Sequence, residues 1–436
     1  MISEDNSKIS PYSHSPPYLW RSLPEGRRGF RGDRIYANDD LILPFNHYPE
    51  CPAVWSALVD GLFSGVSIGS VLLLSALGLA IVFGLMGVIN MAHGELMMLG
   101  AYTTVLVQGT LKGTPLFDSY ILFALIAAFI VTALFGLFLE RTVIRYLYGR
   151  PLETLLATWG VSLMLQQFVR SVSWEFIIGT AIAVALFYGG TIGIKRIPAK
   201  FRNVSTAGIG LVAGTIALQI SNALGNMYGL LMTKPWFGAQ NQDVTAPQWL
   251  RGGLKLGFVD VQLSYVRIFI IVLTVICLAA VYFFLNRTQW GLRIRAVTQN
   301  RSMSACLGIP TDRVDALTFA VGSGLAGIAG CAVSLLGSVG PNTGQNYIID
   351  TFMVVVVGGV GNLVGSIVAA MVIGMSSYFY GTFAGQIPFI QDLSKTIGID
   401  LGAQTMAKVV VFGLIVVFLQ FKPGGLFPQK GRTVDA

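Results

Sequence analysis

Three polar side chains stand close together in an otherwise apolar part of the sequence. Asn90, His93 and Glu95 lie within the glycine-rich stretch Gly84–Tyr102. Ionisable groups at membrane depth are energetically costly and normally face a protein interior or a water-filled cavity. Glycines allow a helix to break, which is tolerated where the backbone lines such a cavity. Two interpretations stay open. Either these side chains line a permeation path, or His93 and Glu95 cap a helix start and tie its turn to a neighbouring segment.

The stretch Arg287–Arg313 is the second place where residue types and spacing indicate a function. Asp312 is its single acid, and its basic residues are Arg287, Arg293, Arg295, Arg301 and Arg313. A loop this basic, between two apolar runs, is typical of the cytoplasmic side of a membrane.

The same stretch has the hydrophobic spacing of one amphipathic helix. Its apolar stripe consists of Leu292, Ala296, Met303 and Leu307. Gly308 and Pro310 are expected to end the helix, and Thr311 or Asp312 to cap the next one. A short helix held at the cytoplasmic surface by two spans is suited to docking a soluble partner, and we interpret it as the place where force arrives from an ATPase.

Enzyme chemistry of the common kinds is not indicated. The sequence contains neither a Gly-Lys pair, which a phosphate-binding Walker A loop needs, nor an HExxH motif. Its three histidines and four cysteines lack the spacing of metal ligands. We therefore expect no catalytic residue, no metal and no cofactor, with ATP hydrolysis carried out by partner subunits.

The composition sets the fold class. Of the 436 residues, 54% are hydrophobic and 11% are charged, against about 25% charged in ordinary soluble proteins. The apolar residues form long runs, which predicts an all-α polytopic membrane protein with about ten or eleven transmembrane segments, broken or hairpin helices included. The net charge of +8 lies in short loops, so it indicates topology and not nucleic-acid binding.

The order of the apolar runs gives the domain boundaries. A polar tail covers residues 1–56, a transmembrane domain covers 57–421, and a cytoplasmic tail covers 422–436. Within the domain, the clear spans are Ala57–Phe83, Ile121–Leu139, Thr154–Val169, Phe176–Ile192, Ser205–Leu230, Tyr265–Leu285, Val314–Leu336 and Ala407–Phe421. Breaks are expected in Gly84–Tyr102 and at Gly358–Asn362, and the small residues of Gly322–Gly330 are expected to allow close helix packing.

Two of these stretches carry a family resemblance. GVINMAHGELMMLGAY and LRIRAVTQNRSMSACLGIPTDRVDALTFAVGSGLAGIAG resemble the permeases of the branched-chain amino acid ABC importer family. Within it, FGAQNQDV, VGPNTGQNYIIDTFMVVVVGGVGN and KPGGLFPQKGR are similar to the urea importer permeases. The resemblance covers Ala57–Val172 and Phe237–Arg432. The segment 173–236, with its two extra spans, looks inserted, and the polar N-terminal tail is unlike the signal-bearing domain of some relatives.

The resemblance implies a five-part importer in a bacterial inner membrane. The chain would contact membrane lipid and bind no nucleic acid. Its partners would be a second homologous permease, two ATP-binding subunits and an extracytoplasmic substrate-binding protein. By position, Leu292–Ile309 becomes the coupling helix, and the residues expected to couple it to the ATPase are Arg293, Arg295, Asn300, Arg301 and Gly308.

The expected substrate is urea, taken up as a nitrogen source. A path for urea needs amide, hydroxyl and carbonyl groups along it. The candidate path residues are Asn90, His93, Glu95, Asn342, Gln345 and Asn346. The segment Asn342–Asn346 suits a plain turn equally well.

Three alternatives to a urea importer remain. One is an ABC permease for branched-chain amino acids or another small amide or amino acid. The other two are a self-contained urea channel and a secondary transporter. A secondary transporter needs a coupling-ion site, usually carboxylates within spans, for which the sequence offers only Glu95 and Asp60.

Overall fold

The computed structural model describes residues 51–173, 219, 236–238, 240–256, 261–383 and 404–427. The predicted spans Phe176–Ile192 and Ser205–Leu230, residues 1–50 of the polar tail and residues 428–436 of the C-terminal tail lie outside the described residues. Everything below refers to the unit that begins at Glu50.

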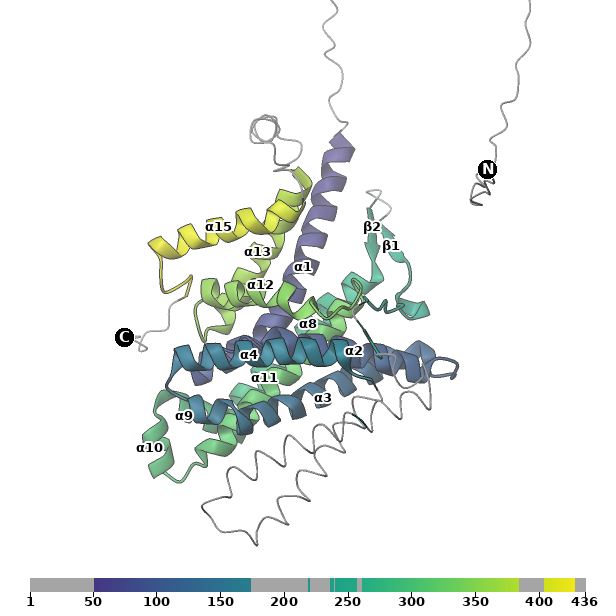
Figure 1. Ribbon diagram of the computed structural model, residues 1–436. Coiled ribbons are helices and arrows are strands. Elements are labelled where there is room, and N and C mark those ends of the chain that lie inside the picture. Colours follow the sequence, from purple (N-terminus) through teal and green to yellow (C-terminus); the bar gives the residue numbers. More distant parts are fainter. Residues whose placement is uncertain are drawn as a thin grey trace, which may run out of the picture. The chain divides into compact units, whose positions relative to one another are not determined.

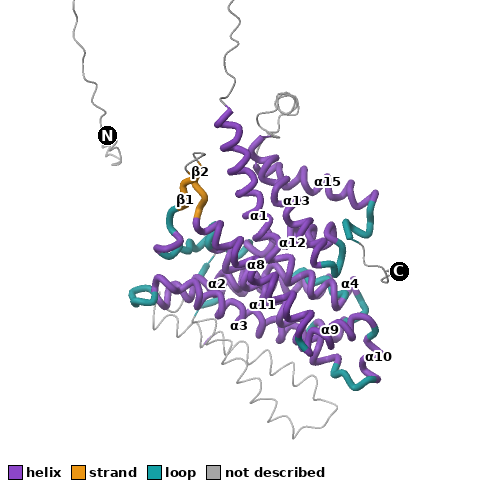
Figure 2. The backbone as a smooth tube through the Cα atoms, turned by 180° about the vertical axis from the view of Figure 1, so that it is seen from behind, coloured by secondary structure: helices purple, strands orange, loops and turns teal. Residues whose placement is uncertain are grey.

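The described part of the chain is helical apart from one two-stranded hairpin (Figures 1 and 2). Its α-helices are α1 (Cys51–Met86), α2 (His93–Leu111), α3 (Tyr120–Thr142), α4 (Pro151–Ser171), α8 (Tyr265–Arg287), α9 (Gln289–Gln299), α10 (Arg301–Cys306), α11 (Thr311–Ser334), α12 (Thr343–Gly358), α13 (Leu363–Phe383) and α15 (Gln404–Phe421). Strands β1 (Gly253–Leu256) and β2 (Val261–Ser264) pair antiparallel directly before α8, so the hairpin and α9 lie at opposite ends of that helix (Figure 1). The all-α polytopic prediction is confirmed.

Five described helices are long and apolar enough to cross a membrane. They are Leu58–Met86, Phe117–Thr142, Tyr265–Arg287, Thr311–Ser334 and Leu363–Phe383. In the most apolar windows of α1 and α11, 83% and 78% of the residues are buried, against about a third or less in the other three. Helices α1 and α11 therefore form the core, and the other three spans surround it.

Glycine contacts bring the core helices together. A Cβ on Gly322 of α11 would lie 2.8 Å from the Gly78 carbonyl oxygen of α1, and one on Gly330 would meet the Met97 carbonyl oxygen of α2. Backbones this close leave no room for a larger side chain. The prediction that Gly322–Gly330 allows close packing is thus confirmed.

Both expected breaks are present. Helix α1 ends at Met86 and α2 begins at His93, with Gly87 at a φ of +69° between them. Helix α12 ends at Gly358 and α13 begins at Leu363. Gly359 and Gly361 have φ values of +99° and +84° there, a backbone region that only glycine enters without strain.

The residues after α15 return to the break between α12 and α13. The backbone N–H of Leu426 donates to the Val357 carbonyl oxygen at 2.8 Å, and that of Phe427 to the Gly358 carbonyl oxygen at 3.4 Å. The last carbonyl groups of a helix have no partner within it. The start of the predicted C-terminal tail therefore completes the end of α12.

The two ends of the segment 173–236 meet. The backbone N–H of Trp236 donates to the Val172 carbonyl oxygen at 2.9 Å. The described residues on either side of this segment are therefore hydrogen-bonded neighbours, and the insertion itself stays a prediction.

Replacing residues 174–235 by a single glycine should therefore leave a folded chain in the membrane. Val172 and Trp236 would become the first and last residues of a β-turn, with glycine at its third position. We expect wild-type abundance in the membrane fraction and a single symmetric peak in detergent size-exclusion chromatography. Deleting α12, which packs against α1, α2 and α13, is the control expected to abolish that peak. Aggregation of the glycine-linked chain would show that the segment is integral to the fold.

Candidate functional site

The polar residues of the first break form a buried cluster between α1, α2 and α4. His93 is the first residue of α2, and its Nε2 lies 3.1 Å from the Ser75 carbonyl oxygen of α1. The Oε1 of Glu95 accepts hydrogen bonds from Ser162 Oγ at 3.0 Å and Gln166 Nε2 at 2.7 Å. Both side chains are at most 1% exposed. They tie α2 to its neighbours.

Neither side chain caps α2, so that part of the capping interpretation is wrong. The N-cap residue is Ala92, which has no side-chain cap. Asn90 bonds locally, because its Oδ1 accepts the backbone N–H of Ala92 at 3.0 Å. The three predicted residues are thus brought into one buried region, with His93 directed to α1 and Glu95 to α4.

Helix α4 supplies polar residues that the sequence reasoning missed. Its buried stripe repeats every four residues and comprises Thr154, Thr158, Ser162 and Gln166, with the partly buried Arg170 next in line. Several of its large apolar side chains point outward, among them Leu152 and Met164, which are 77% and 74% exposed. Such a helix presents its polar face to the protein and its apolar face to lipid. The regular four-residue spacing was the signal in the sequence.

The amide residues near α12 divide into two groups. Asn342 is the N-cap residue of α12, and its Oδ1 accepts from Arg170 Nη2 at 2.7 Å. Gln345 and Asn346 are helical and exposed, so the prediction of a plain turn over Asn342–Asn346 is wrong beyond its first residues. Asn342 joins the cluster through Arg170, whereas no described contact brings Gln345 or Asn346 to it.

Two neighbouring cavities lie near α1 and α13, away from the buried cluster. They measure about 290 and 460 Å³ and share Leu336 and Tyr378 in their walls. The smaller one contains the ion pair between Asp350 Oδ2 of α12 and Lys408 Nζ of α15, at 2.9 Å. The larger one contains Asp60, whose carboxylate accepts from the Tyr378 hydroxyl at 2.8 Å. Sequence reasoning missed the pair because its two residues are 58 positions apart.

The basic loop is two helices and not one. Helix α9 ends at Gln299, and Asn300 caps α10 by accepting the backbone N–H of Met303 at 2.9 Å. This break shifts the helical phase. Leu292, Met303 and Leu307 of the predicted stripe are 62%, 58% and 76% exposed, whereas the packed face consists of Gly291, Ile294, Val297 and Ser304.

The start of α11 also differs from the prediction. Its N-cap residue is Pro310, without a side-chain cap. Thr311 and Asp312 lie inside the first turn, where the Asp312 carboxylate pairs with Arg145. The expectation that one of them caps the helix is therefore wrong.

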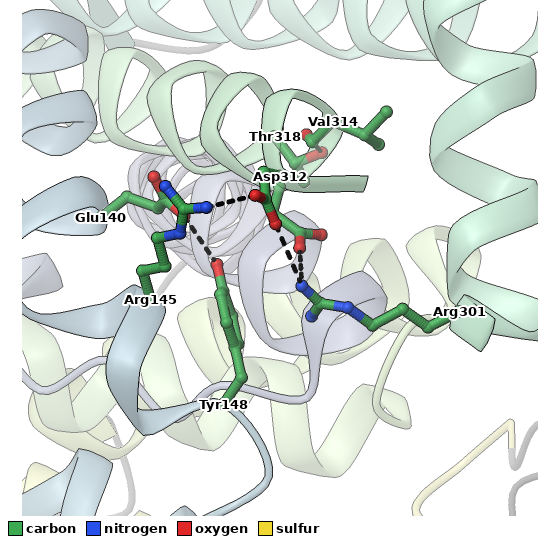
Figure 3. A network of polar contacts seen from close by, with 8 residues as sticks. Glu140, Arg145, Tyr148, Arg301, Asp312, Val314 and Thr318 are labelled. Carbon is green, nitrogen blue, oxygen red and sulfur yellow. Dashed lines mark hydrogen bonds and ion pairs between the residues drawn. The ribbon is translucent and has the colours of Figure 1, made fainter. Parts of the chain in front are cut away.

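Figure 3 shows the ionic network that holds α10 to α11 and to the end of α3. Arg301 Nη2 lies 2.7 Å from Asp315 Oδ2 and 4.0 Å from Asp312 Oδ1. The Arg301 guanidinium also stacks 4.8 Å from the centre of the Tyr148 ring, a favourable cation–π distance. Arg301 is therefore an anchor within the chain.

Tyr148 connects this anchor to α3. Its hydroxyl donates to Glu140 Oε1 at 3.3 Å (Figure 3). Burial and the nearby carboxylates of Asp315 and Glu140 raise the pKa of Tyr148, so the phenol keeps its proton and remains a donor. The network thus joins α3, α10 and α11 through one tyrosine.

Of the remaining predicted coupling residues, Arg295, Asn300 and Gly308 are exposed and Arg293 is partly buried. Arg293 stacks 5.0 Å from the centre of the Trp290 ring. Arg295 is exposed, with its Nη1 3.5 Å from Asn286 Oδ1. Asn300 and Gly308 are exposed at the ends of α10, with Gly308 at a φ of +81°. Arg293 and Arg295, unlike Arg301, therefore take part in no ion pair among the described residues.

These features define a class: a multi-span α-helical membrane protein with two broken helices, a buried polar cluster and an anchored pair of short helices outside the spans. Residues 61–419 match the family described as "Branched-chain amino acid transport system / permease component". The chain belongs to this family of transport permeases. No solved structure matches it.

Its curated relatives are permeases as well. The chain is similar to the high-affinity branched-chain amino acid transport system permease protein BraD of Pseudomonas aeruginosa, with 26% identity over 84% of this chain and 94% of that protein. It is 23% identical to the corresponding permease LivH of Escherichia coli K12, over 72% of this chain and 83% of LivH. A shorter likeness, 27% identity over 24% of this chain and 32% of the relative, links it to the fructose import permease FrcC of Rhizobium meliloti.

The Asp350–Lys408 pair predicts a charge-exchange result. Reversing either charge alone (Asp350→Lys or Lys408→Asp) brings two like charges together, one of them at position 350, whose side chain is only 14% exposed, which is costly. We expect each single variant to lower the abundance of folded chain several-fold, and the double exchange to restore most of it, as measured by fluorescence-detected size-exclusion chromatography. Lys422→Asp, in the exposed stretch after α15, is the control. A double variant no better than the singles would contradict the pairing.

Proposed function

We propose that this permease forms half of the translocation path of an ATP-driven importer, in a bacterial inner membrane, and that α9 and α10 dock a separate ATPase. A second homologous permease would complete the path, two ATP-binding subunits would supply the energy, and an extracytoplasmic binding protein would deliver the substrate. Family membership supports the general scheme. The observation that carries the docking role is the construction of the α9–α10 pair.

That pair combines a rigid base with an outward-facing contact surface. Arg301 fixes α10 to α11 through Asp315. Leu292 and Leu307 are 62% and 76% exposed on the same pair, although the loop is too polar to lie in lipid. Exposed apolar side chains rimmed by polar ones mark a protein-binding surface. A force applied there would pass through α10 into α11, one of the two core helices.

Reversing the charge of Arg293 and Arg295 should separate ATP hydrolysis from uptake. We expect Arg293→Glu with Arg295→Glu to leave the chain folded, because neither side chain takes part in the Arg301 network, and to reduce ATP-driven uptake at least tenfold in proteoliposomes. Arg141→Glu, at the exposed end of α3, is the matched control and should keep full uptake. Wild-type uptake in the double variant would contradict the docking role.

The substrate we propose is urea, taken up as a nitrogen source. Urea is small and neutral, and it binds through hydrogen bonds. The buried cluster offers such partners, because Asn90, Ser162 and Gln166 present amide and hydroxyl groups. Of the six proposed path residues, Asn90, His93, Glu95 and Asn342 belong to this region, while Gln345 and Asn346 would act from the exposed face of α12.

A branched-chain amino acid is the second candidate substrate. The names of the relatives favour it, and so does the smaller cavity. Its wall combines the Asp350–Lys408 pair with Ile68, Val71 and Ile373. Opposite charges beside aliphatic side chains would suit a zwitterion with an apolar side chain.

Transport by the complete five-part complex in proteoliposomes distinguishes these possibilities. With labelled urea and labelled leucine, we expect ATP-dependent accumulation of urea that excess leucine does not inhibit. Accumulation of leucine alone would assign the amino acid instead. Urea flux through liposomes that contain only this chain, without ATP, would identify a self-contained channel.

A further inference from the structure

We propose that Glu95, Tyr102 and Arg170 form a binding subsite for a small neutral solute that carries both N–H groups and a carbonyl oxygen, the amide and urea class. The proposal deepens the proposed function, since it names a place on the path where such a substrate would bind. Tyr102 and Arg170 have no role in the features described so far beyond the contact of Arg170 with Asn342.

The subsite lies between α2 and α4, which carry it on facing sides. The backbone N–H of Met91 donates to Thr158 Oγ1 at 3.1 Å, and one turn further along each helix Glu95 bonds Ser162 and Gln166. Tyr102 is two turns beyond Glu95, and Arg170 is one turn beyond Gln166. Glu95 and Arg170 both adjoin the start of α12: a Cβ on Gly344 would lie 2.7 Å from Glu95 Oε2, and Arg170 Nη2 bonds Asn342 Oδ1. Tyr102 belongs to the same buried cluster as Val169, the residue before Arg170. The three side chains therefore follow one another along the side of α2 and α4 that meets the start of α12.

Each of the three side chains keeps one buried polar atom without a hydrogen-bond partner among the described residues: Glu95 Oε2, the Tyr102 hydroxyl and Arg170 Nε. Glu95 and Tyr102 are only 1% and 2% exposed. A buried polar atom left unpaired is costly, and native proteins pair nearly all of them. Three such atoms from two facing helices indicate a place that a polar molecule fills.

Other atoms of each of these three side chains are bonded or packed, so the unpaired atoms are held in fixed positions. The other carboxylate oxygen of Glu95 is bound by Ser162 and Gln166. The Nη2 of Arg170 is bound by Asn342 Oδ1 at 2.7 Å. The Tyr102 ring packs 4.4 Å from the centre of the Phe237 ring. A ligand would therefore bind side chains that are already ordered, so its binding would cost little side-chain entropy.

The chemistry of the three atoms selects the ligand class. The free carboxylate oxygen accepts hydrogen bonds, the Arg170 N–H donates, and the phenol hydroxyl can do either. One negative and one positive side chain cancel, so an ion of either sign gains little. A urea or primary amide can donate its N–H groups to Glu95 and accept at its carbonyl oxygen from Arg170 and Tyr102.

Saturation-transfer NMR on the purified full-length chain tests the subsite without requiring transport. The probe is acetamide, whose methyl protons report weak binding, with urea as competitor. We expect transfer to acetamide that urea abolishes, and at least a fivefold loss of transfer in Tyr102→Phe and in Glu95→Gln. Both substitutions keep the side-chain shape. Thr103→Val removes a neighbouring hydroxyl that is already bonded to the Leu99 carbonyl oxygen and should keep the signal.

Uptake by the complete complex gives the second measurement. In Tyr102→Phe we expect the KM for urea to rise about tenfold, with little change in kcat. A tenfold rise corresponds to the free energy of roughly one hydrogen bond. No transfer to acetamide in the wild-type chain, or equal transfer in all variants with only a lower Tm in Tyr102→Phe, would overturn the subsite and show that the three atoms hold structural water. Normal acetamide binding without any ATP-driven uptake would instead contradict the importer role and leave the subsite standing.

Discussion

Polar atoms in the lipid-embedded part of a protein must find hydrogen-bond partners within the protein, because lipid offers none. This constraint explains the arrangement of α4, whose polar stripe turns inward to α2 while Leu152, Leu156 and Met164 face outward. It also explains why Glu95 is bonded by Ser162 and Gln166, and why Asp350 is paired with Lys408 across two helices. The broken helices obey the same rule: the free carbonyls at the end of α12 are taken by the backbone of Leu426 and Phe427.

The architecture separates a rigid centre from the parts that could move. Helices α1 and α11 pack through glycines so closely that their backbones touch, which resists relative sliding. The α9–α10 pair is fastened to the first turns of α11 by Arg301 and Asp315, and Tyr148 extends that link to Glu140 of α3. A push on α10 would therefore reach the core as a whole. The glycine breaks beside α2 and α12 are described places where the backbone can bend. The first adjoins the buried polar cluster, and Gly361 of the second packs against Gly84 near the end of α1.

Much of this fold could be predicted from the sequence, because long apolar runs and glycines report directly on membrane helices and their breaks. The break at Gly358–Asn362 and the close packing of Gly322–Gly330 are examples. Predictions that depended on helical phase failed. Asn300 interrupts the basic loop by capping a second helix, so the stripe through Leu292 and Leu307 is exposed. The polar ladder of α4 was visible as a four-residue repeat, whereas contacts between distant residues, such as Arg170 with Asn342, leave no local pattern.

The central claim is that the α9–α10 pair faces the cell interior and is covered by an ATPase. Cys306 is an exposed native thiol on α10, while Cys277 and Cys331 are buried. Labelling with a membrane-impermeant maleimide, read at the Cys306 peptide by mass spectrometry, tests the claim directly. The account predicts labelling in inside-out vesicles stripped of ATPase, protection when the ATPase is restored, and no labelling in right-side-out vesicles. Labelling of Cys306 from the outside, or labelling unaffected by the ATPase, would contradict it.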